Sequence, residues 1–330
     1  MARTAIVTGG AGFIGSHLVD QLVSRELKVR VIDNLMGGRF ENLSKHHSNS
    51  QVEFIEQDIR SLTPESSIFK GVDSVYHLAG IGDIVPSIEN PADYMDINVQ
   101  GTVRTLEASR LNGCRRFIYA ASSSCYGLAN TPTDENHPIN PQYPYALSKY
   151  LGELAVFHWG KTYRMQTNSI CIFNAYGPRV KTRGVYGAVF GVFLKQKLEG
   201  KPLTVVGDGH QSRDFIYVTD VADAFYAAAE SEHYGERFNI GAGQPKSILE
   251  LVSIIGGPYE NIPKRPGEPD ITFAKINKAK KHLGWTPKVD FKTGVSFMLE
   301  NLNAWSDAPL WEKSSIAKAS EKWFLYMGKS

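Results

Sequence analysis

The sequence lacks long apolar runs and a strong excess of charge of either sign. Its 36 Lys and Arg residues nearly balance 34 Asp and Glu residues, which leaves a formal net charge of +2. A protein that binds duplex nucleic acid usually carries a basic excess or a basic stripe, so no nucleic-acid partner is expected. No window approaches the roughly 18 consecutive apolar residues of a transmembrane helix, so no membrane span is expected either.

Cysteine is scarce as well. The three cysteines, Cys114, Cys125 and Cys171, are too few and odd in number for a disulfide framework, which indicates reduced thiols. Cys and His residues do not cluster at metal-ligand spacing, so no metal is predicted. The N-terminal residues also lack the charged and long apolar regions of a signal peptide. These absences together predict a cytoplasmic protein.

The first half of the 330-residue chain alternates short β-branched segments with helical patterns. Such alternation predicts an α/β fold with a doubly wound, Rossmann-like parallel sheet covered on both faces. A ligand is expected beyond the carboxyl ends of the strands. The expected strands are Thr4–Thr8, Lys28–Asp33, Val52–Glu56, Ser74–Leu78, Arg116–Ala121 and Thr167–Phe173, and the expected helices are Ile14–Arg25, Asn98–Asn112 and Tyr145–Tyr163.

After Phe173 the regular alternation is lost, so we expect a first domain over residues 1–173 and a smaller α/β domain over 174–330, with the chain crossing between them. A tail that begins at Trp305 is rich in aromatic residues and is interpreted as packed helix rather than a partner surface. The second half is expected to contain loops at Asn174–Gly184 and Gly256–Pro269, helices at Gly187–Glu199 and Val221–Glu230, and strands at Leu203–Val206 and Phe215–Val218.

A glycine-rich turn follows the first expected strand. Gly9 permits a tight turn, Gly12 lets the backbone approach a pyrophosphate, and Gly15 lets helix and strand pack closely. The helix that follows offers free N–H groups and the positive end of its dipole to a phosphate. Asp33 ends the next strand, where a carboxylate accepts hydrogen bonds from a ribose diol and repels a 2′-phosphate. This pattern predicts NAD rather than NADP, a preference that the nearby Arg39 could weaken.

Tyr145 and Lys149 are four residues apart and therefore share one helix face. A phenol with a pKa of about 10 is a poor base at neutral pH. A nearby ammonium and an oxidised nicotinamide both favour the phenolate and lower that pKa. Tyr145 is thus a candidate base that removes the proton of a substrate hydroxyl, while hydride leaves the carbon that bears this hydroxyl. Ser122, Ser123 and Ser124 end an expected strand and supply hydroxyl donors.

These motifs make the chain similar to the extended short-chain dehydrogenases/reductases of the nucleotide-sugar epimerase and dehydratase group. The resemblance implies a tightly held NAD, a triad of Ser122, Tyr145 and Lys149, a nucleoside-diphosphate sugar substrate, and a homodimer formed through the helices Asn98–Asn112 and Tyr145–Tyr163. It runs from Thr8 to about Pro287 and rests on Thr8–His17, Asp33–Leu35, Asp58–Ile59, His77–Gly80, Asn98–Thr102, Ser122–Gly127, Tyr145–Lys149, Phe173–Arg179, Gly207–Asp223 and Arg265–Glu268.

Residues 1–173 are accordingly expected to bind NAD, and residues 174–330 the nucleotide sugar. Asp58 is a candidate adenine contact, with a helix cap as the alternative, and His77 is interpreted as a core histidine. The candidate cofactor-binding residues are Gly9, Gly12, Phe13, Ile14, Gly15, Asp33, Asn34, Asp58, Ile59, Leu78, Ala79, Gly80, Asn98, Tyr145 and Lys149.

The resemblance also bears on the reaction. The 4,6-dehydratases carry Asp and Glu where this chain has Ser123 and Ser124, and the glutamate usual in uronate decarboxylases is missing from the same segment. Cys125 is displaced by one residue from the cysteine of 3,5-epimerases and is interpreted as structural. What remains is 4-epimerisation of a UDP-hexose through a transient 4-keto sugar.

The candidate substrate contacts lie in the second half of the chain. Asn174, Arg213 and Arg265 match diphosphate-binding positions of the family, and guanidinium groups suit phosphate oxygens. Glu268 replaces the usual ribose-binding aspartate. The candidate substrate-binding residues are Ser123, Ser124, Asn174, Ala188, Val189, Thr204, Val206, Arg213, Arg265, Glu268 and Thr272, of which Ala188, Val189, Thr204 and Val206 flank the base.

Thr272 stands seven residues after Arg265, where some hexose-only epimerases carry a tyrosine that walls the sugar pocket. A small residue there predicts room for a 2-acetamido group and hence activity on UDP-N-acetylglucosamine and UDP-N-acetylgalactosamine, UDP-glucose and UDP-galactose, or both pairs. Asp83 argues in the other direction, because it replaces a small residue of the N-acetylhexosamine epimerases.

Two alternatives stay open. The chain could be another nucleotide-sugar enzyme, namely a 2-epimerase, decarboxylase, dehydratase or ketoreductase acting on a CDP-, dTDP- or GDP-sugar. It could also be a non-catalytic NAD-binding sensor or scaffold, although such relatives tend to lose the tyrosine or the lysine and this chain keeps both.

Overall fold

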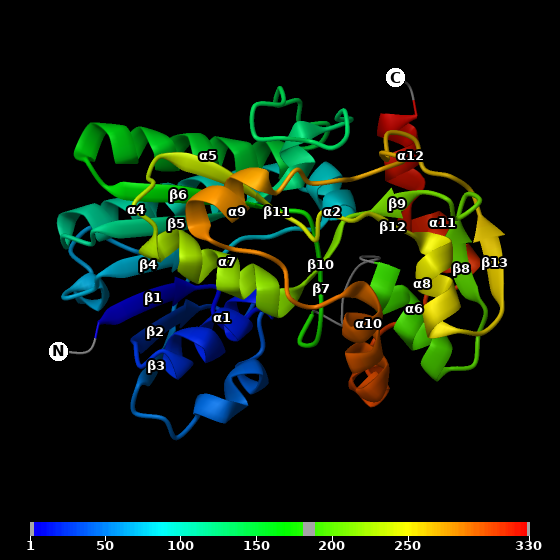
Figure 1. The fold of residues 1–330 in the computed structure, drawn as a ribbon, viewed down its shortest axis with the longest axis horizontal. Helices are drawn as coiled ribbons and strands as arrows, with labels where there is room; N and C mark the ends of the chain where they lie inside the picture. The colour runs from blue at the N-terminus through cyan, green and yellow to red at the C-terminus, as the bar shows by residue number, and fades with distance from the viewer. Residues whose placement is uncertain (1–2, 181–188, 329–330) are drawn as a thin grey trace.

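Seven parallel strands form the central sheet of the protein, in the order β11-β6-β5-β4-β1-β2-β3 (Figure 1). The structure is a computed structural model and describes residues 3–180 and 189–328. The sheet strands are β1 Thr4–Thr8, β2 Lys28–Asp33, β3 Val52–Glu56, β4 Ser74–His77, β5 Arg116–Ser122, β6 Gln166–Ile172 and β11 Glu236–Ile240.

The sheet is buried on both faces. Along β5, Ile118 and Ala120 enter one apolar core, whereas Phe117, Tyr119 and Ala121 enter the core on the opposite face. Successive side chains of a strand point to opposite faces, and two covered faces therefore require a nearly continuous apolar strand. This explains why the strands of the first half read as uninterrupted β-branched and aromatic runs.

Helices cover the two faces, and the predicted doubly wound fold is confirmed. Helices α1 (Phe13–Ser24) and α7 (Val218–Glu230) pack together on one face, and α4 (Gly101–Leu111) and α5 (Pro144–Tyr163) on the other (Figure 1). Short helical segments connect the strands of this part at η1 Phe40–His46, η2 Ile59–Ser61, η3 Ser67–Phe69, α2 Ile84–Glu89, α3 Pro91–Met95, η4 Asp96–Gln100 and η5 Ser123–Tyr126.

The second half builds a smaller lobe from three strand pairs around its own apolar core. Strands β7 (Asn174–Tyr176) and β10 (Phe215–Tyr217) are parallel, as are β8 (Leu203–Val206) and β13 (Tyr259–Ile262), whereas β9 (Ser212–Arg213) and β12 (Lys246–Ser247) are antiparallel. The helical segments here are α6 Val189–Leu198, α8 Ile248–Ile255, α10 Phe291–Glu300, η6 Leu302–Trp305, α11 Lys313–Ala319 and α12 Glu321–Met327, whereas α9 Asn277–Leu283 packs against β11 and α7 of the larger lobe.

The predicted sheet strands agree with the structure to within one residue at each end, but the expectations for the second half need correction. The expected loop Asn174–Gly184 begins with β7, and residues 181–184 lie outside the described part of the chain. The expected loop Gly256–Pro269 contains β13. Both strands are three or four residues long and are flanked by Gly and Pro, which masked their pattern.

Two helices also differ from their predicted starts. Helix α7 begins earlier, at Val218, which the sequence placed at the end of a strand. Helix α4 begins later than predicted, at Gly101, and the expected start at Asn98 lies in a π-helical turn over Asp96–Gln100. The expected tail helix is present as α11 and α12, and Trp305 and Trp323 are buried.

Three other expectations concern cysteines, metals and membranes. All three cysteines are free thiols and are buried. The described residues contain no group of three or more Cys, His, Asp and Glu side chains that could hold a metal ion. None of the helices in residues 3–180 and 189–328 is both long and apolar enough to cross a lipid bilayer.

A buried ion pair joins the two halves of the chain. Glu153 of α5 is 1% exposed and pairs with Arg237 of β11, whose Nε donates to Glu153 Oε1 over 2.9 Å. The Ser169 hydroxyl of β6 donates to the same carboxylate over 2.5 Å. Since β11 comes from beyond residue 173, this network fixes the returning strand against the helix that carries Tyr145 and Lys149.

We expect Arg237→Met to destabilise the protein by about 3–5 kcal/mol, because it leaves the buried Glu153 carboxylate without its partner. The measurement is the midpoint of urea unfolding. Arg3→Met is the matched control, because the Arg3–Glu230 pair is exposed on both sides and should contribute less than about 1 kcal/mol. Equal losses in the two variants would contradict this role for Arg237.

Candidate active site

The glycine turn between β1 and α1 has no room for side chains. A Cβ atom at Gly9 would lie 2.7 Å from the Ala79 backbone nitrogen, and one at Gly15 would lie 2.1 Å from the Gly9 carbonyl oxygen. Gly9 also has a φ of 69°, which other residues rarely adopt. Gly12 is the N-cap of α1 and has no side chain to satisfy the first N–H groups. The turn therefore presents bare backbone and a helix N-terminus to the space above the sheet.

A pocket of about 400 Å³ lies over this turn, at the carboxyl ends of the central strands. It brings together most of the predicted cofactor contacts. Its lining includes Gly9, Gly12, Phe13, Ile14, Gly15, Asp33, Asn34, Asp58, Ile59, Leu78, Ala79 and Gly80.

The remaining three predicted cofactor contacts, Asn98, Tyr145 and Lys149, lie beside this pocket rather than in its lining. Asn98 accepts a hydrogen bond from the Ile81 N–H over 2.9 Å, and its Oδ1 lies 2.7 Å from where a Cβ of Gly80 would stand. The Lys149 ammonium lies 3.8 Å from that same point. Gly80 therefore lets the backbone pass directly over both side chains.

Asp33 is held at the end of β2 by two backbone donors. Its carboxylate accepts from the Ala11 N–H over 2.9 Å and from the Leu35 N–H over 2.8 Å. Burial raises the pKa of this carboxyl group, and the two backbone hydrogen bonds oppose the rise. Each carboxylate oxygen retains a second lone pair, so the group can still accept from a diol. The nearby Arg39 side chain is exposed.

Asp58 and His77 both have structural partners. Asp58 caps η2 through the Arg60 N–H at 2.8 Å and also pairs with the Arg60 guanidinium, which lowers the pKa of Asp58 to about 2. The helix-cap interpretation is thus confirmed, and Asp58 lines the pocket as well. The His77 ring is fully buried between the hydroxyls of Thr8 at 2.8 Å and Thr102 at 2.9 Å, as predicted for a core histidine.

Ser122, Tyr145 and Lys149 meet where β5 ends and α5 begins. A side-chain hydrogen bond joins Ser122 to the Tyr145 phenol. Burial raises the pKa of this phenol, and the Ser122 hydrogen bond opposes the rise. Burial also lowers the pKa of the Lys149 ammonium to about 8, and its Nζ stands 4.4 Å from the centre of the Tyr119 ring.

In the chain alone the pKa of Tyr145 is thus raised, and the expected lowering by the ammonium and an oxidised nicotinamide together stays a prediction. The physical reason for the rise is burial, which disfavours the charged forms of Tyr145 and Lys149 together.

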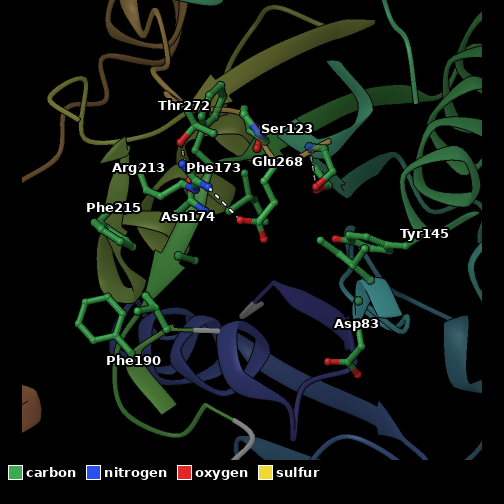
Figure 2. Close-up of a pocket in the computed structure, with 18 of the residues that line it drawn as sticks. Asp83, Ser123, Tyr145, Phe173, Asn174, Phe190, Arg213, Phe215, Glu268 and Thr272 are labelled. Atoms are coloured by element: carbon green, nitrogen blue, oxygen red, sulfur yellow. Dashed lines mark hydrogen bonds and ion pairs between the residues drawn. The ribbon is translucent and has the colours of Figure 1, made fainter. Parts of the chain in front are cut away.

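A second pocket of about 590 Å³ separates the triad from the smaller lobe. Figure 2 shows Tyr145 and Asp83 on one side of it and Arg213, Asn174 and Thr272 on the other. The two pockets adjoin, because Phe13, Ile14, Gly82, Asp83 and Val180 line both of them. A molecule in the second pocket can thus reach Tyr145 and the space above the glycine turn at once.

Two arginines and one carboxylate form the wall opposite the triad. Arg265 Nη1 lies 2.8 Å from Glu268 Oε1, and Arg213 Nη2 lies 3.8 Å from Glu268 Oε2. Arg213 also donates to the Ser212 carbonyl over 2.9 Å, and burial lowers the pKa of its guanidinium. The wall carries one net positive charge, as an anionic ligand requires.

Thr272 lines this pocket and holds Asn174 in place. Its hydroxyl donates to Asn174 Oδ1 over 2.8 Å and accepts from the Asp214 N–H over 3.1 Å. The amide oxygen of Asn174 is thereby engaged, which leaves its NH2 group as the donor for a ligand. No local pattern indicates this contact, because Asn174 and Thr272 are 98 residues apart.

Most of the other predicted substrate contacts lie in the wall of the larger pocket. Ser123, Ser124, Val189, Thr204 and Val206 line the larger pocket, whereas Ala188 lies outside the described residues. Cys125 is 2% exposed, and its thiol donates to the Ala146 carbonyl. Burial raises the pKa of Cys125 to about 12, which fits its interpretation as structural. The sequence missed the aromatic lining residues Tyr143, Phe190, Phe215 and Trp323.

Known proteins share this architecture. The family model for GDP-mannose 4,6 dehydratase matches residues 6–298. A putative UDP-glucose 4-epimerase of Methanocaldococcus jannaschii is 39% identical over 299 residues, which cover 88% of this chain and 95% of that protein. UDP-glucuronic acid decarboxylase 2 of Arabidopsis thaliana is 34% identical over 329 residues, which cover 96% of this chain and 72% of that protein.

Solved structures agree with these relatives. UDP-glucuronic acid 4-epimerase from Bacillus cereus, in complex with UDP-glucuronic acid and NAD, superposes with a TM-score of 0.85 at 32% identity, covering 91% of this chain and 99% of its own. UDP-N-acetylglucosamine 4-epimerase from Methanobrevibacter ruminantium gives a TM-score of 0.85 at 30% identity, with the same coverage of 91% and 99%. The chain therefore belongs to the GDP-mannose 4,6 dehydratase family of extended short-chain dehydrogenases/reductases.

Proposed function

We propose that the protein is an NAD-dependent 4-epimerase of UDP-hexoses that works in the cytoplasm. The observation that carries the proposal is the position of Ser122, Tyr145 and Lys149 between a bare glycine turn and a wall with two arginines. The similarity to enzymes named as UDP-sugar 4-epimerases supports it.

The pocket over the glycine turn fits NAD. A Cβ at Gly9 or Gly15 would overlap backbone atoms, so these glycines let the turn bring the N-terminus of α1 to the pocket, where it would favour the charge of a pyrophosphate. Asp33 would accept from the adenosine ribose diol. When bound, NAD would supply a hydride acceptor and donor for C4 of the sugar and a positive charge that favours the phenolate of Tyr145.

The residues of the chain have separate roles in this proposal. Tyr145 removes the proton from O4 and later returns it, Ser122 holds the same oxygen by its hydroxyl, and the Lys149 ammonium supports the phenolate. Arg213, Arg265 and Asn174 hold the diphosphate. Val189, Thr204 and Val206 would flank the uracil.

The lining near Tyr145 argues for epimerisation over elimination or decarboxylation. Ser123 and Ser124 line the pocket beside the triad and carry hydroxyls, which are too weakly acidic to replace a carboxylate pair. The pocket has a volume of about 590 Å³. This space would allow the sugar to turn after C4 is oxidised, while the arginines retain the diphosphate. The decarboxylase relatives make loss of carbon dioxide the alternative outcome to be tested.

We also propose a homodimer formed through α4 and α5. Large apolar side chains on these helices are exposed, namely Leu111 at 53%, Leu147 at 40%, Leu154 at 45% and Tyr163 at 44%. Burying such residues against a second copy would remove apolar surface from water.

We expect the purified protein, without added cofactor, to interconvert UDP-N-acetylglucosamine with UDP-N-acetylgalactosamine or UDP-glucose with UDP-galactose, as read by proton NMR. Tyr145→Phe should lower the rate by about 10²–10⁴-fold, because the base is lost, and should retain bound NAD. Carbon dioxide, a 4-keto-6-deoxy sugar or net oxidation of NADPH as the product would reject the proposed reaction.

We expect Asp33→Ser to weaken NAD binding by about 10–100-fold, since hydrogen bonds from the ribose diol to a charged acceptor are lost. Affinity for NADP should rise in the same variant, because the carboxylate that repels a 2′-phosphate is gone. Titration of the cofactor-free protein with each dinucleotide measures both effects. Parallel losses for NAD and NADP would indicate a merely structural role for Asp33.

We expect Thr272→Tyr to reduce kcat/KM for UDP-N-acetylglucosamine at least about tenfold more than for UDP-glucose, because a larger wall would clash with the acetamido group. Thr272→Val is the matched control. It keeps the size of the side chain but loses the hydrogen bond to Asn174, so it should affect both substrates alike. Equal effects of Thr272→Tyr on the two substrates would contradict a specificity role.

A further inference from the structure

The C-terminal helix α12 completes the pocket that holds the proposed substrate. The family model ends at residue 298, so α11 and α12 lie beyond the matched part of the chain. Trp323 and Met327 of α12 are four residues apart and share one helix face, which turns inward. The residues between them, Phe324, Leu325 and Tyr326, are exposed at 40%, 53% and 63%.

On one side, α12 is attached to the segment that carries Arg265. Trp323 is 3% exposed, and its indole Nε1 donates to the Pro266 carbonyl over 2.7 Å. The Arg265 guanidinium lies 5.9 Å from the centre of the Trp323 ring. A Cβ at Gly267 would lie 3.2 Å from Met327 Cε, so the two segments are in close contact.

On the other side, α12 contacts the lobe that carries Tyr145. It packs against α2 (Figure 1), and Lys322 forms an ion pair with Glu89 of α2 at 3.3 Å. The Trp323 ring lies 6.2 Å from the ring of Tyr143, which in turn stacks on Tyr145 at 6.4 Å. One helix therefore joins the reacting side of the pocket to the arginine side.

The chemistry of the Trp323 side chain limits what it can recognise. Its only polar group is engaged by Pro266, so it presents an apolar ring to the pocket. In the proposed complex C4 reacts at Tyr145 and the diphosphate binds at Arg265. The hexose ring would therefore lie between these two residues. The part of a hexose that suits an aromatic surface is its C–H face, together with the methyl of an acetamido group.

We propose that Trp323 of α12 is a sugar-binding and specificity residue, whose indole covers the apolar face of the hexose between Tyr145 and Arg265. This inference rests on the proposed function, because it takes a nucleoside-diphosphate hexose as the ligand of the larger pocket. It makes the C-terminal segment 313–327 part of the substrate site rather than a support for the core alone.

The test compares Trp323→Ala with Tyr326→Ala, an exposed aromatic residue on the same helix. Isothermal titration calorimetry on the NAD-loaded protein measures binding of UDP, UDP-glucose and UDP-N-acetylglucosamine. We expect Trp323→Ala to weaken binding of at least one UDP-sugar about tenfold or more and that of UDP less than threefold. Tyr326→Ala should leave all three affinities unchanged.

Two further variants distinguish the effect of the aromatic ring from that of the indole hydrogen bond. They also keep the test valid if Trp323→Ala does not fold. Trp323→Phe keeps an aromatic face but loses the bond to Pro266, so UDP-sugar affinity should stay within about threefold. Trp323→Leu fills the core without an aromatic ring, so it should repeat the sugar-specific loss even if Trp323→Ala does not fold. Equal weakening of UDP and UDP-sugars, or no weakening in Trp323→Ala and Trp323→Leu, would overturn the proposal.

This binding test is independent of turnover. A wild-type protein that binds a UDP-sugar without inverting C4 would refute the proposed reaction and leave the Trp323 comparison intact. If UDP-sugars do not bind, the same comparison is made with CDP-, dTDP- and GDP-hexoses against their free nucleotides. A protein that binds none of these sugars would overturn both proposals.

Discussion

The close contact between β1, α1 and the end of β4 is the constraint on which the rest of the site depends. It exists because Gly9 and Gly15 have no side chains, and any Cβ at these positions would overlap backbone atoms. The contact places the N-terminus of α1 directly above the carboxyl edge of the sheet, next to Asp33 and Ala79. Since both faces of the sheet are covered by helices, this edge is where polar groups of neighbouring strands can meet a ligand.

Burial shapes the chemistry at this edge. Tyr145 and Lys149 are withdrawn from water by the same packing that aligns them, and burial shifts the pKa of each group in the direction that disfavours its charged form. In the proposed mechanism, Tyr145 would form its phenolate when a positively charged nicotinamide lies in one pocket and a hydroxyl substrate in the other. The base is thereby coupled to occupancy of both pockets, which share Phe13, Ile14 and Asp83.

Residues close in sequence were predictable, and contacts between distant residues were not. The glycine turn, Asp33 and the Tyr145–Lys149 pair each follow from local spacing, and the structure places them at the predicted edge. The bonds of Thr272 to Asn174 and of Arg237 to Glu153 join segments separated by 98 and 84 residues. Neither is visible in local periodicity. Strands β7 and β13 were missed because their pairing partners, rather than their own short sequences, stabilise them.

The larger pocket lies between two lobes, so the two lobes must be held at the correct distance from each other. The family motifs do not by themselves set this distance. Tyr145 belongs to one lobe and Arg265 to the other, so the distance between them depends on contacts that cross the gap. The Glu153–Arg237 pair fixes β11 against α5 within the larger lobe, whereas α12 contacts both lobes, through Glu89 of α2 and through Pro266 beside Arg265. In the proposed function the arginines hold the diphosphate while C4 must reach Tyr145, so a residue that affects this separation would also affect which sugars react. The C-terminal segment can therefore change specificity without altering the triad.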